Sequence, residues 1–264
     1  MRPLLEFPMA GRVRGVLCDI DDTLTTGGRL TAPAYAAMEH LQRAGLLVVP
    51  ITGRPAGWCD HIARMWPVDA VVGENGAFYF RYDRARHTMQ RHFADDPATR
   101  IRNRARLIQI GAHIVKAVPG AKLSADQHYR ETDLAIDYCE DVPRLAPAAV
   151  ENIVTLMQQE GLTAKVSSIH VNGWFGDHDK LSMTKTLMRA CFSIDLDARK
   201  DEFVFAGDSP NDAPMFAFFP HAVGVANIAA FNDQLAALPA YVTTAASGAG
   251  FCELADFLLA AHQT

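Results

Sequence analysis

Cysteine is scarce in this sequence and does not occur in pairs. Five cysteines are spread through 264 residues, and no two of them form a Cys-x-x-Cys spacing. An odd, scattered set argues against a disulfide framework and against a cysteine zinc site. We therefore expect reduced thiols, which are typical of a cytoplasmic protein.

Long hydrophobic runs and an excess of positive charge are also missing. No apolar run approaches the ~20 residues of a membrane-spanning helix. The first residues, MRPLLEFPMAGR, place a glutamate within a short apolar stretch, unlike a signal peptide. The net charge of −5 disfavours nucleic acid and anionic membrane surfaces as partners. We expect a soluble protein that binds neither.

The sequence contains instead a repeated alternation of strand and helix signals. Apolar, strand-like runs alternate with helix-like segments at residues 13–18, 32–44, 46–51, 55–65 and 70–72. The alternation returns near the C-terminus, at residues 182–191, 203–206, 214–218, 222–225 and 250–262. This order predicts an α/β fold with a doubly wound parallel sheet, in which ligands bind beyond the C-terminal ends of the strands.

The middle of the chain breaks this alternation. Residues 84–178 mix helix and strand signals without a nucleotide-binding loop. We expect a core of residues 1–83 and 179–264 and an inserted α+β cap at residues 84–178. A helix is predicted over residues 98–117, with the arginines of this segment on its solvated face. Its predicted buried stripe consists of Ile101, Ala105, Ile108, Ala112 and Val115.

Two acids follow the first predicted strand. Asp19 and Asp21 are separated by one residue, and Thr23 comes next but one. Because side chains alternate along an extended chain, both carboxylates would share a face, where a hard divalent cation would neutralise them. An ionised aspartate beside such a cation can attack phosphorus. Taken alone, the same residues also suit a helix N-cap.

Two further strands end in polar residues at the same predicted edge. The strand at residues 46–51 leads into Thr52 and Gly53, just before a predicted helix. Because a helix N-terminus after a small turn binds anions, these residues are candidates to bind phosphate. A turn that only caps the helix is the alternative. The strand at residues 203–206 leads to Asp208 and Asp212, which indicate a second group of metal ligands or a polar turn.

Two lysines begin the helix predicted near residue 182. Lys180 and Lys185 both lie close to the start of this segment, where a positive charge opposes the helix dipole. A catalytic role would explain such a placement. A solvated surface lysine is the alternative for each.

Together these segments resemble the haloacid dehalogenase-like superfamily of phosphohydrolases. The resemblance rests on Asp-x-Asp-x-Thr, a strand ending in Thr-Gly-Arg, a lysine and Gly-Asp-x-x-Asn-Asp, in that order. Residues 73–77, 222–227 and 248–251 also resemble the subgroup with a cap between its second and third motifs. That subgroup, IIB, includes Cof-type sugar phosphatases, sucrose-phosphate phosphatases and phosphomannomutases.

The resemblance implies a magnesium site and two catalytic acids. Asp19 would be the nucleophile and a Mg²⁺ ligand. Asp21 would act as general acid and then base, and would bind the metal through its backbone carbonyl. Asp208 would also bind Mg²⁺, with Asn211 and Asp212 supporting the site, Asp212 as a further ligand and Asn211 beside the phosphate.

The resemblance also implies a set of phosphate-binding groups. Thr52, Gly53, Arg54, Asn75 and Lys180 stand at the positions concerned. Lys180, which fits the family spacing better than Lys185, would also screen the charge of Asp19.

The cap would select the substrate, as it does in the resembling families. Arg130, His170 and Asn172 are candidate contacts to the leaving group, and ordinary cap surface is the alternative for each.

We therefore expect a Mg²⁺-dependent phosphatase that hydrolyses a small phosphorylated metabolite, in particular a sugar phosphate, through an aspartyl-phosphate. Two other functions fit part of the pattern. A phosphosugar mutase shares Asp19 and Asp21, but it would transfer phosphate without releasing it. A non-catalytic, receiver-like regulatory domain also groups acids with Thr and Lys, but it would bind a phospho-ligand without turnover.

Overall fold

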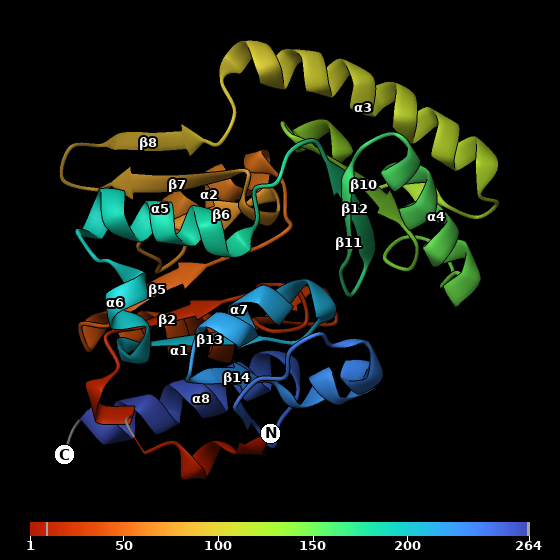
Figure 1. Ribbon diagram of the computed structural model, residues 1–264. Coiled ribbons are helices and arrows are strands. Elements are labelled where there is room, and N and C mark those ends of the chain that lie inside the picture. The colour runs from red at the N-terminus through yellow and green to blue at the C-terminus, as the bar shows by residue number, and fades with distance from the viewer. Residues whose placement is uncertain (9, 263–264) are drawn as a thin grey trace.

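The computed structural model describes residues 1–8 and 10–262. Its core sheet has six parallel strands in the order β1-β15-β14-β13-β2-β5 (Figure 1). The strands are β1 (Arg2–Pro3), β2 (Gly15–Cys18), β5 (Leu47–Pro50), β13 (Phe203–Gly207), β14 (Ala222–Gly224) and β15 (Tyr241–Val242). The predicted doubly wound parallel sheet is confirmed.

Helices cover both faces of this sheet because side chains alternate along its strands. Val16 and Cys18 of β2 lie in one buried cluster, with side chains of helices α1, α2 and α8. Leu17, between them, lies in a second cluster with α5 and α7. The helices of the core are α1 (Ala32–Arg43), α2 (Ala56–Met65), α5 (Lys180–Phe192), α6 (Leu196–Arg199), α7 (Ala213–Phe218) and α8 (Ser247–His262).

A second, antiparallel sheet continues the core beyond β5. A parallel bridge from Ile51 to Val72 connects it to the end of β5. Its strands are β6 (Val71–Gly73), β7 (Phe78–Asp83) and β8 (Thr88–Phe93). β8 pairs with β7 along its whole length. The predicted boundary at residue 84 falls in the turn of this hairpin, so we propose that the cap begins after β8.

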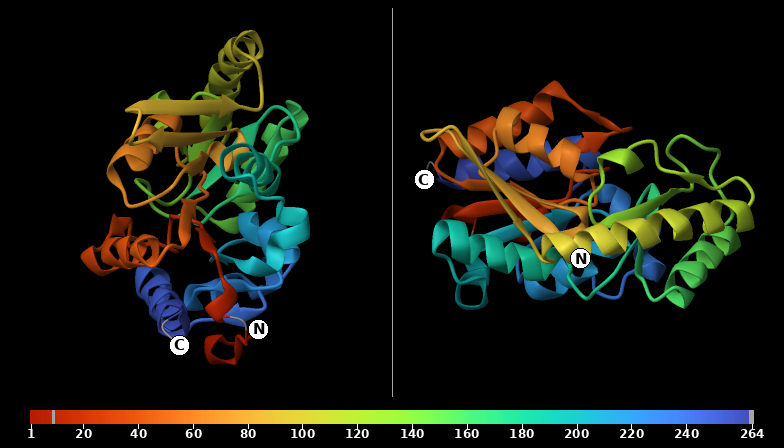
Figure 2. Two further views of the ribbon diagram at one scale, coloured as in Figure 1. Left: turned by 90° about the vertical axis from the view of Figure 1, so that its left-hand side faces the viewer. Right: turned by 90° about the horizontal axis from the view of Figure 1, so that it is seen from above.

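The inserted elements form a separate layer beside the core, as both views in Figure 2 show. Four antiparallel strands make its sheet in the order β11-β12-β10-β9. The elements are α3 (Pro97–Ala117), β9 (Lys122–Leu123), β10 (Asp133–Asp137), α4 (Pro147–Gln159), β11 (Thr163–Val166) and β12 (His170–Trp174). The described chain ends both lie on the side of the core away from this layer (Figure 1).

The helix α3 buries a different face from the predicted one. Ile101 and Ile108 are 72% and 65% exposed, whereas Leu107, Ile110 and Ile114 are buried in the cap core. The predicted stripe was wrong because this helix carries two apolar stripes of the same period. Contact with β10 and α4 selects one of them, and periodicity alone does not distinguish between the two.

Short elements complete the core edge that faces the cap. A small hairpin, β3 (Thr25–Thr26) with β4 (Arg29–Leu30), follows β2. The 3₁₀ helices near the site are η3 (Glu74–Gly76), η4 (Gln127–Tyr129) and η6 (Pro210–Asp212). Among the described residues, none of the helices combines the length and hydrophobicity that a membrane span requires.

Candidate active site

Three neighbouring parallel strands deliver the motif residues to one edge of the core sheet. β2 lies between β13 and β5, and the three strands run in the same direction. The residues that follow them, Asp19, Asp208 and Thr52, therefore meet at their C-terminal ends. The backbone amide of Asp19 still donates to the carbonyl of Ala206 at 2.9 Å, which fixes the first acid against the strand that carries the second.

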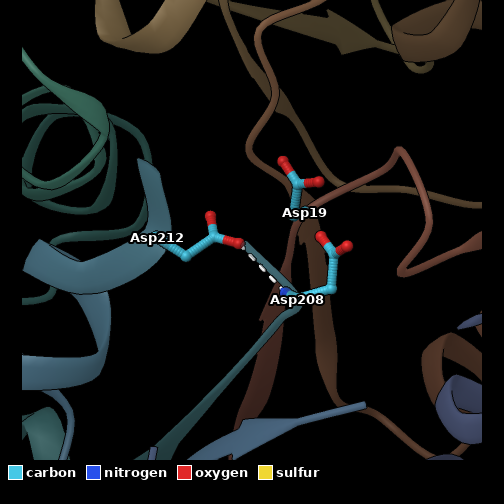
Figure 3. Close-up of side chains that lie close together, drawn as sticks. All are labelled: Asp19, Asp208 and Asp212. Carbon is cyan, nitrogen blue, oxygen red and sulfur yellow. Dashed lines mark hydrogen bonds between the residues drawn. The ribbon is translucent and has the colours of Figure 1, made fainter. Parts of the chain in front are cut away.

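Three of the predicted acids converge (Figure 3). Oxygen atoms of Asp19, Asp208 and Asp212 all lie within 4.8 Å of one another, and the three residues are buried. Burial raises the pKa of Asp19 to about 7; Lys180 opposes this shift and Asp212 adds to it. Burial, with Asp19 and Asp212, also raises the pKa of Asp208 well above its usual range. Buried oxygen donors that repel one another suit a hard cation such as Mg²⁺.

Asp212 also orders the loop in which it lies. Its Oδ2 accepts hydrogen bonds from the backbone amides of Asp208 at 3.1 Å and Ser209 at 3.4 Å. Its Oδ1 accepts from Lys180. These contacts hold Asp208 in place while Asp212 completes the acidic group.

Lys180 is the lysine that reaches the site. Its Nζ lies 2.6 Å from Asp19 Oδ1 and 2.8 Å from Asp212 Oδ1, and the side chain is buried. Lys185 instead pairs with exposed Asp197, at 2.6 Å. The geometry thus favours Lys180, the lysine that the spacing favoured.

The start of α5 positions this lysine. Asp179 caps the helix by accepting a hydrogen bond from the amide of Ser182 at 2.7 Å. The turn before β7 comes very close to this helix start. A Cβ atom on Gly76, which has a φ of +104°, would lie 2.0 Å from the carbonyl oxygen of Asp179. Only glycine fits this approach.

The predicted phosphate turn is also ordered. Thr52 is buried, and its Oγ1 accepts from the amide of Arg54 at 3.0 Å. Asn75 packs against Gly53: its side-chain amide lies 3.1 Å from the position of a Gly53 Cβ. Within the described chain, Asn75 Nδ2 is buried without a hydrogen-bond partner. A donor left free in this way is available to an anion, so a phosphate-binding role remains the prediction for this turn.

The Arg54 side chain has partners that the sequence did not indicate, and its phosphate-binding role stays a prediction. Two nitrogens of its guanidinium donate to the Asp21 carboxylate at 2.7–3.0 Å. It also pairs with two acids of the cap, Glu140 at 2.7 Å and Asp126 at 3.4 Å. The Asp21 carboxylate therefore lies apart from the acidic group of Asp19, facing an arginine that connects core and cap.

The Arg130 prediction also needs correction. The side chain is fully buried, and its donors bind Asp126, Asp133 and the carbonyl of Gly53, the last at 2.8 Å. No part of this guanidinium is exposed to a leaving group. It joins the cap to the phosphate turn instead. Asn172 donates to Asp133 at 3.0 Å, in the same network.

A narrow cavity remains between the core and the cap. The turn from β11 to β12 closes it above Asp19, and Asn172 and Asn211 also line it. Asn211 Oδ1 accepts from Ser209 Oγ at 2.7 Å. His170 lines the same cavity, with Nε2 at 2.8 Å from Glu140 Oε2.

Sequence reasoning assigned no site role to several residues of this region. Asn227 donates to Asp208 Oδ2 at 3.0 Å, and Thr23 lies 3.3 Å from Asp208 Oδ1. Buried Glu74 accepts from the amides of Ala56 and Thr132, and so joins α2 to the cap. Burial raises the pKa of Glu74 to about 7. The place of Asn227 after a strand was a usable signal.

Comparison with known proteins agrees with this geometry. A model of the haloacid dehalogenase-like hydrolase family matches residues 16–131, which include the first two motifs. A search of curated proteins found no match to the sequence.

Solved structures match almost the whole chain. A Thermoplasma acidophilum protein is 18% identical, with a TM-score of 0.69 over 93% of this chain and 98% of its own. The sucrose-phosphatase of Synechocystis, solved with sucrose and phosphate, is 14% identical, with a TM-score of 0.63 over 93% and 98%. The C-terminal domain of C. albicans trehalose-6-phosphate phosphatase is 13% identical, with a TM-score of 0.70 over 98% of both chains. At these identities the likeness shows a shared fold.

The motif residues meet at one sheet edge, the fold is shared over nearly the full length, and the family model covers the segment that carries the first acids. Residues 16–131 therefore match the haloacid dehalogenase-like hydrolase family, and nearly the whole chain shares its fold with the solved structures.

Proposed function

We propose that this phosphoric monoester hydrolase cleaves a small phosphorylated metabolite, in particular a sugar phosphate, with Asp19 as nucleophile and Mg²⁺ as cofactor. The observation that carries the proposal is the buried group of Asp19, Asp208 and Asp212, with Lys180 2.6 Å from Asp19. The fold shared with a sucrose-phosphatase and a trehalose-6-phosphate phosphatase supports the sugar-phosphate class. Free cysteines in the described chain support a cytoplasmic location.

Each residue of the proposed site has a distinct role in the reaction. Asp19 attacks phosphorus and forms an aspartyl-phosphate, which splits one difficult displacement into two. Asp21 gives a proton to the leaving alcohol and then takes one from the attacking water. Lys180, Thr52 and the amide of Gly53 hold the phosphoryl oxygens and compensate their charge.

The acidic group suits Mg²⁺ because its donors are carboxylate oxygens. Asp19 and Asp208 would hold the ion, with Asp212 as a further ligand and the backbone carbonyl of Asp21 also available. A bound Mg²⁺ would neutralise charge on the transferring phosphoryl group.

The test is phosphate release from a panel of sugar phosphates with MgCl₂, for the wild type, Asp19→Asn and Asp22→Asn. Asp19→Asn should lose hydrolysis while its circular dichroism and melting temperature show a folded protein. Asp22→Asn is the matched control because Asp22 has a φ of +56°, which Asn tolerates, and has no proposed role. Full activity in Asp19→Asn would refute the nucleophile. Phosphate moved within one sugar without release would indicate a mutase.

A further inference from the structure

A large groove opens beside Asp21, and Asp19 is not among the residues that line it. It has a volume of about 540 Å³, which is typical of a small-molecule site. The β3–β4 hairpin, α2 and η4 form its walls. Its lining is mostly apolar and includes the aromatic side chains Trp58, His61, Trp66 and Tyr129.

This groove adjoins the cavity above Asp19 and shares two wall residues with it. Asp21 and Arg54 line both the groove and the narrow cavity above Asp19. In the proposed reaction the ester oxygen must come within hydrogen-bond reach of Asp21, so the leaving group begins at this wall. The cavity above Asp19 is closed by the cap turn at Ser168. The adjoining space that can hold a bulky organic group is the groove.

The aromatic wall suits a flat ring. Trp58 is 42% exposed and Tyr129 49% exposed, so both rings offer apolar surface. The Arg54 guanidinium lies 4.6 Å from the Trp58 ring centre and orients the indole beside Asp21. Gly57 lets α2 approach Tyr129 closely, since a Cβ there would be 3.0 Å from Tyr129. Aromatic faces bind flat, apolar ring surfaces well.

We propose that this groove is the leaving-group site and that the substrate's alcohol carries a ring with a flat apolar face, which stacks on Trp58. The inference rests on the proposed phosphatase function and narrows its substrate class. Acyclic phosphate esters would reach Asp21 without filling the groove. Two sources share this ring chemistry, a pyranose sugar and an aromatic alcohol.

The experiment compares three esters with the Mg²⁺-loaded enzyme. Glucose 1-phosphate carries a pyranose, p-nitrophenyl phosphate an aromatic ring, and glycerol 3-phosphate no ring. Trp58→Ala should raise KM about tenfold for at least one ring ester, from the usual strength of ring stacking. It should change KM for glycerol 3-phosphate less than twofold. Trp58→Phe should restore most of the affinity because it keeps an aromatic face.

Measuring KM and kcat separately distinguishes the loss of ring stacking from a displacement of Arg54. Losing the Arg54–Trp58 contact would lower kcat for all three esters, including glycerol 3-phosphate. Ile108→Ala, an exposed apolar change on α3 outside the groove, is the control and should alter no KM. An equal KM change for all three esters, or no change for either ring ester, overturns the groove assignment.

A binding experiment tests this inference independently of the proposed function. If the wild type hydrolyses no ester, the phosphatase proposal fails. Calorimetric titration of Asp19→Asn with p-nitrophenyl phosphate and glucose 1-phosphate, with and without Trp58→Ala, then still tests the groove. About tenfold weaker binding of either ester in the double variant supports it, and equal binding of both esters refutes it.

Discussion

At the residue scale, the same side-chain types have very different surroundings in this protein. Lys180 lies buried between two acids, whereas Lys185 makes a partly exposed surface pair. Arg130, a predicted substrate contact, is buried among carboxylates, whereas Arg54 pairs with Asp21 and still lines the cavity above Asp19. Position relative to the rest of the chain, and not residue type, determines which charged groups can act on a substrate.

The two lysines provide a matched prediction. Lys180→Met should lower kcat ~10²–10³-fold, the usual effect of losing a preorganised charge at a reacting oxyanion. It should also destabilise the metal-free protein by ~3–5 kcal/mol, because two buried acids lose their counter-charge. Lys185→Met should change activity little and stability by less than ~1 kcal/mol. Steady-state kinetics and urea unfolding measure both effects; similar losses in the two variants would contradict this assignment.

At the element scale, loops that are far apart in sequence carry the site. The start of α5 is held against the turn at Gly76, and the β5–α2 turn is held by the cap through Arg130 and Glu74. Arg54 joins the same turn to Glu140, which follows β10. Movement of any of these elements would displace a group that we propose binds phosphate.

Substitutions at two glycines can distinguish the effect of a steric clash from the effect of backbone strain. Gly76 and Gly161 both have positive φ, but a Cβ on Gly161 would meet nothing within 4 Å. Gly161→Ala should cost ~1 kcal/mol and leave activity intact. Gly76→Ala should cost more and lower kcat, because its Cβ would push the start of α5, and with it Lys180, away from Asp19. Denaturant melts with kinetics check this, and unchanged kcat in Gly76→Ala would argue against it.

The contribution of the Arg54–Glu140 contact to stability should depend on pH. Burial would raise the pKa of Glu140, but hydrogen bonds from His170 and Arg54 lower it from its usual 4.5 to about 2. A lowered pKa gives stability that is present above pH 4.5 and is lost as the pH falls toward 2. The difference in unfolding free energy between wild type and Glu140→Gln should therefore shrink as the pH drops below 4.5.

Exposed Glu151 on α4 supplies the control for that titration. Glu151→Gln should show no comparable dependence on pH over the same range. A Glu140→Gln difference that stays constant down to pH 3 would mean that the ion pair with Arg54 does not form in solution.

At the scale of the whole molecule, the core supplies the reacting groups and the cap closes over them. Burial raises the pKa of both Asp19 and Asp208, and neighbouring carboxylates add to the shift. The cap turn seals the space above them, and the aromatic groove extends from the same wall. In the proposed function, metal binding, closure and leaving-group choice would therefore be divided among three parts of the fold.

Magnesium should stabilise the metal-free protein. At 100 times its dissociation constant, a ligand of the folded state adds about 2.7 kcal/mol to the unfolding free energy. The gain should be larger at pH 8 than at pH 6, because the pKa of Asp19 is about 7 and the proton must leave before the metal binds. Differential scanning fluorimetry with MgCl₂ and then EDTA measures the shift. Asp208→Asn should abolish it; a shift retained in that variant would place the ion elsewhere.

The sequence by itself determined the central strands β2, β5, β13 and β14, the doubly wound core and the strand-end residues Asp19, Thr52 and Asp208. Those features depend on local alternation and on the rule that parallel strands end at one edge. The tertiary structure alone decided the buried face of α3, the partners of Arg54 and Arg130, and the aromatic groove beside Asp21. Each of these depends on groups distant in sequence, and no local pattern specifies which distant surfaces or charges will pack together.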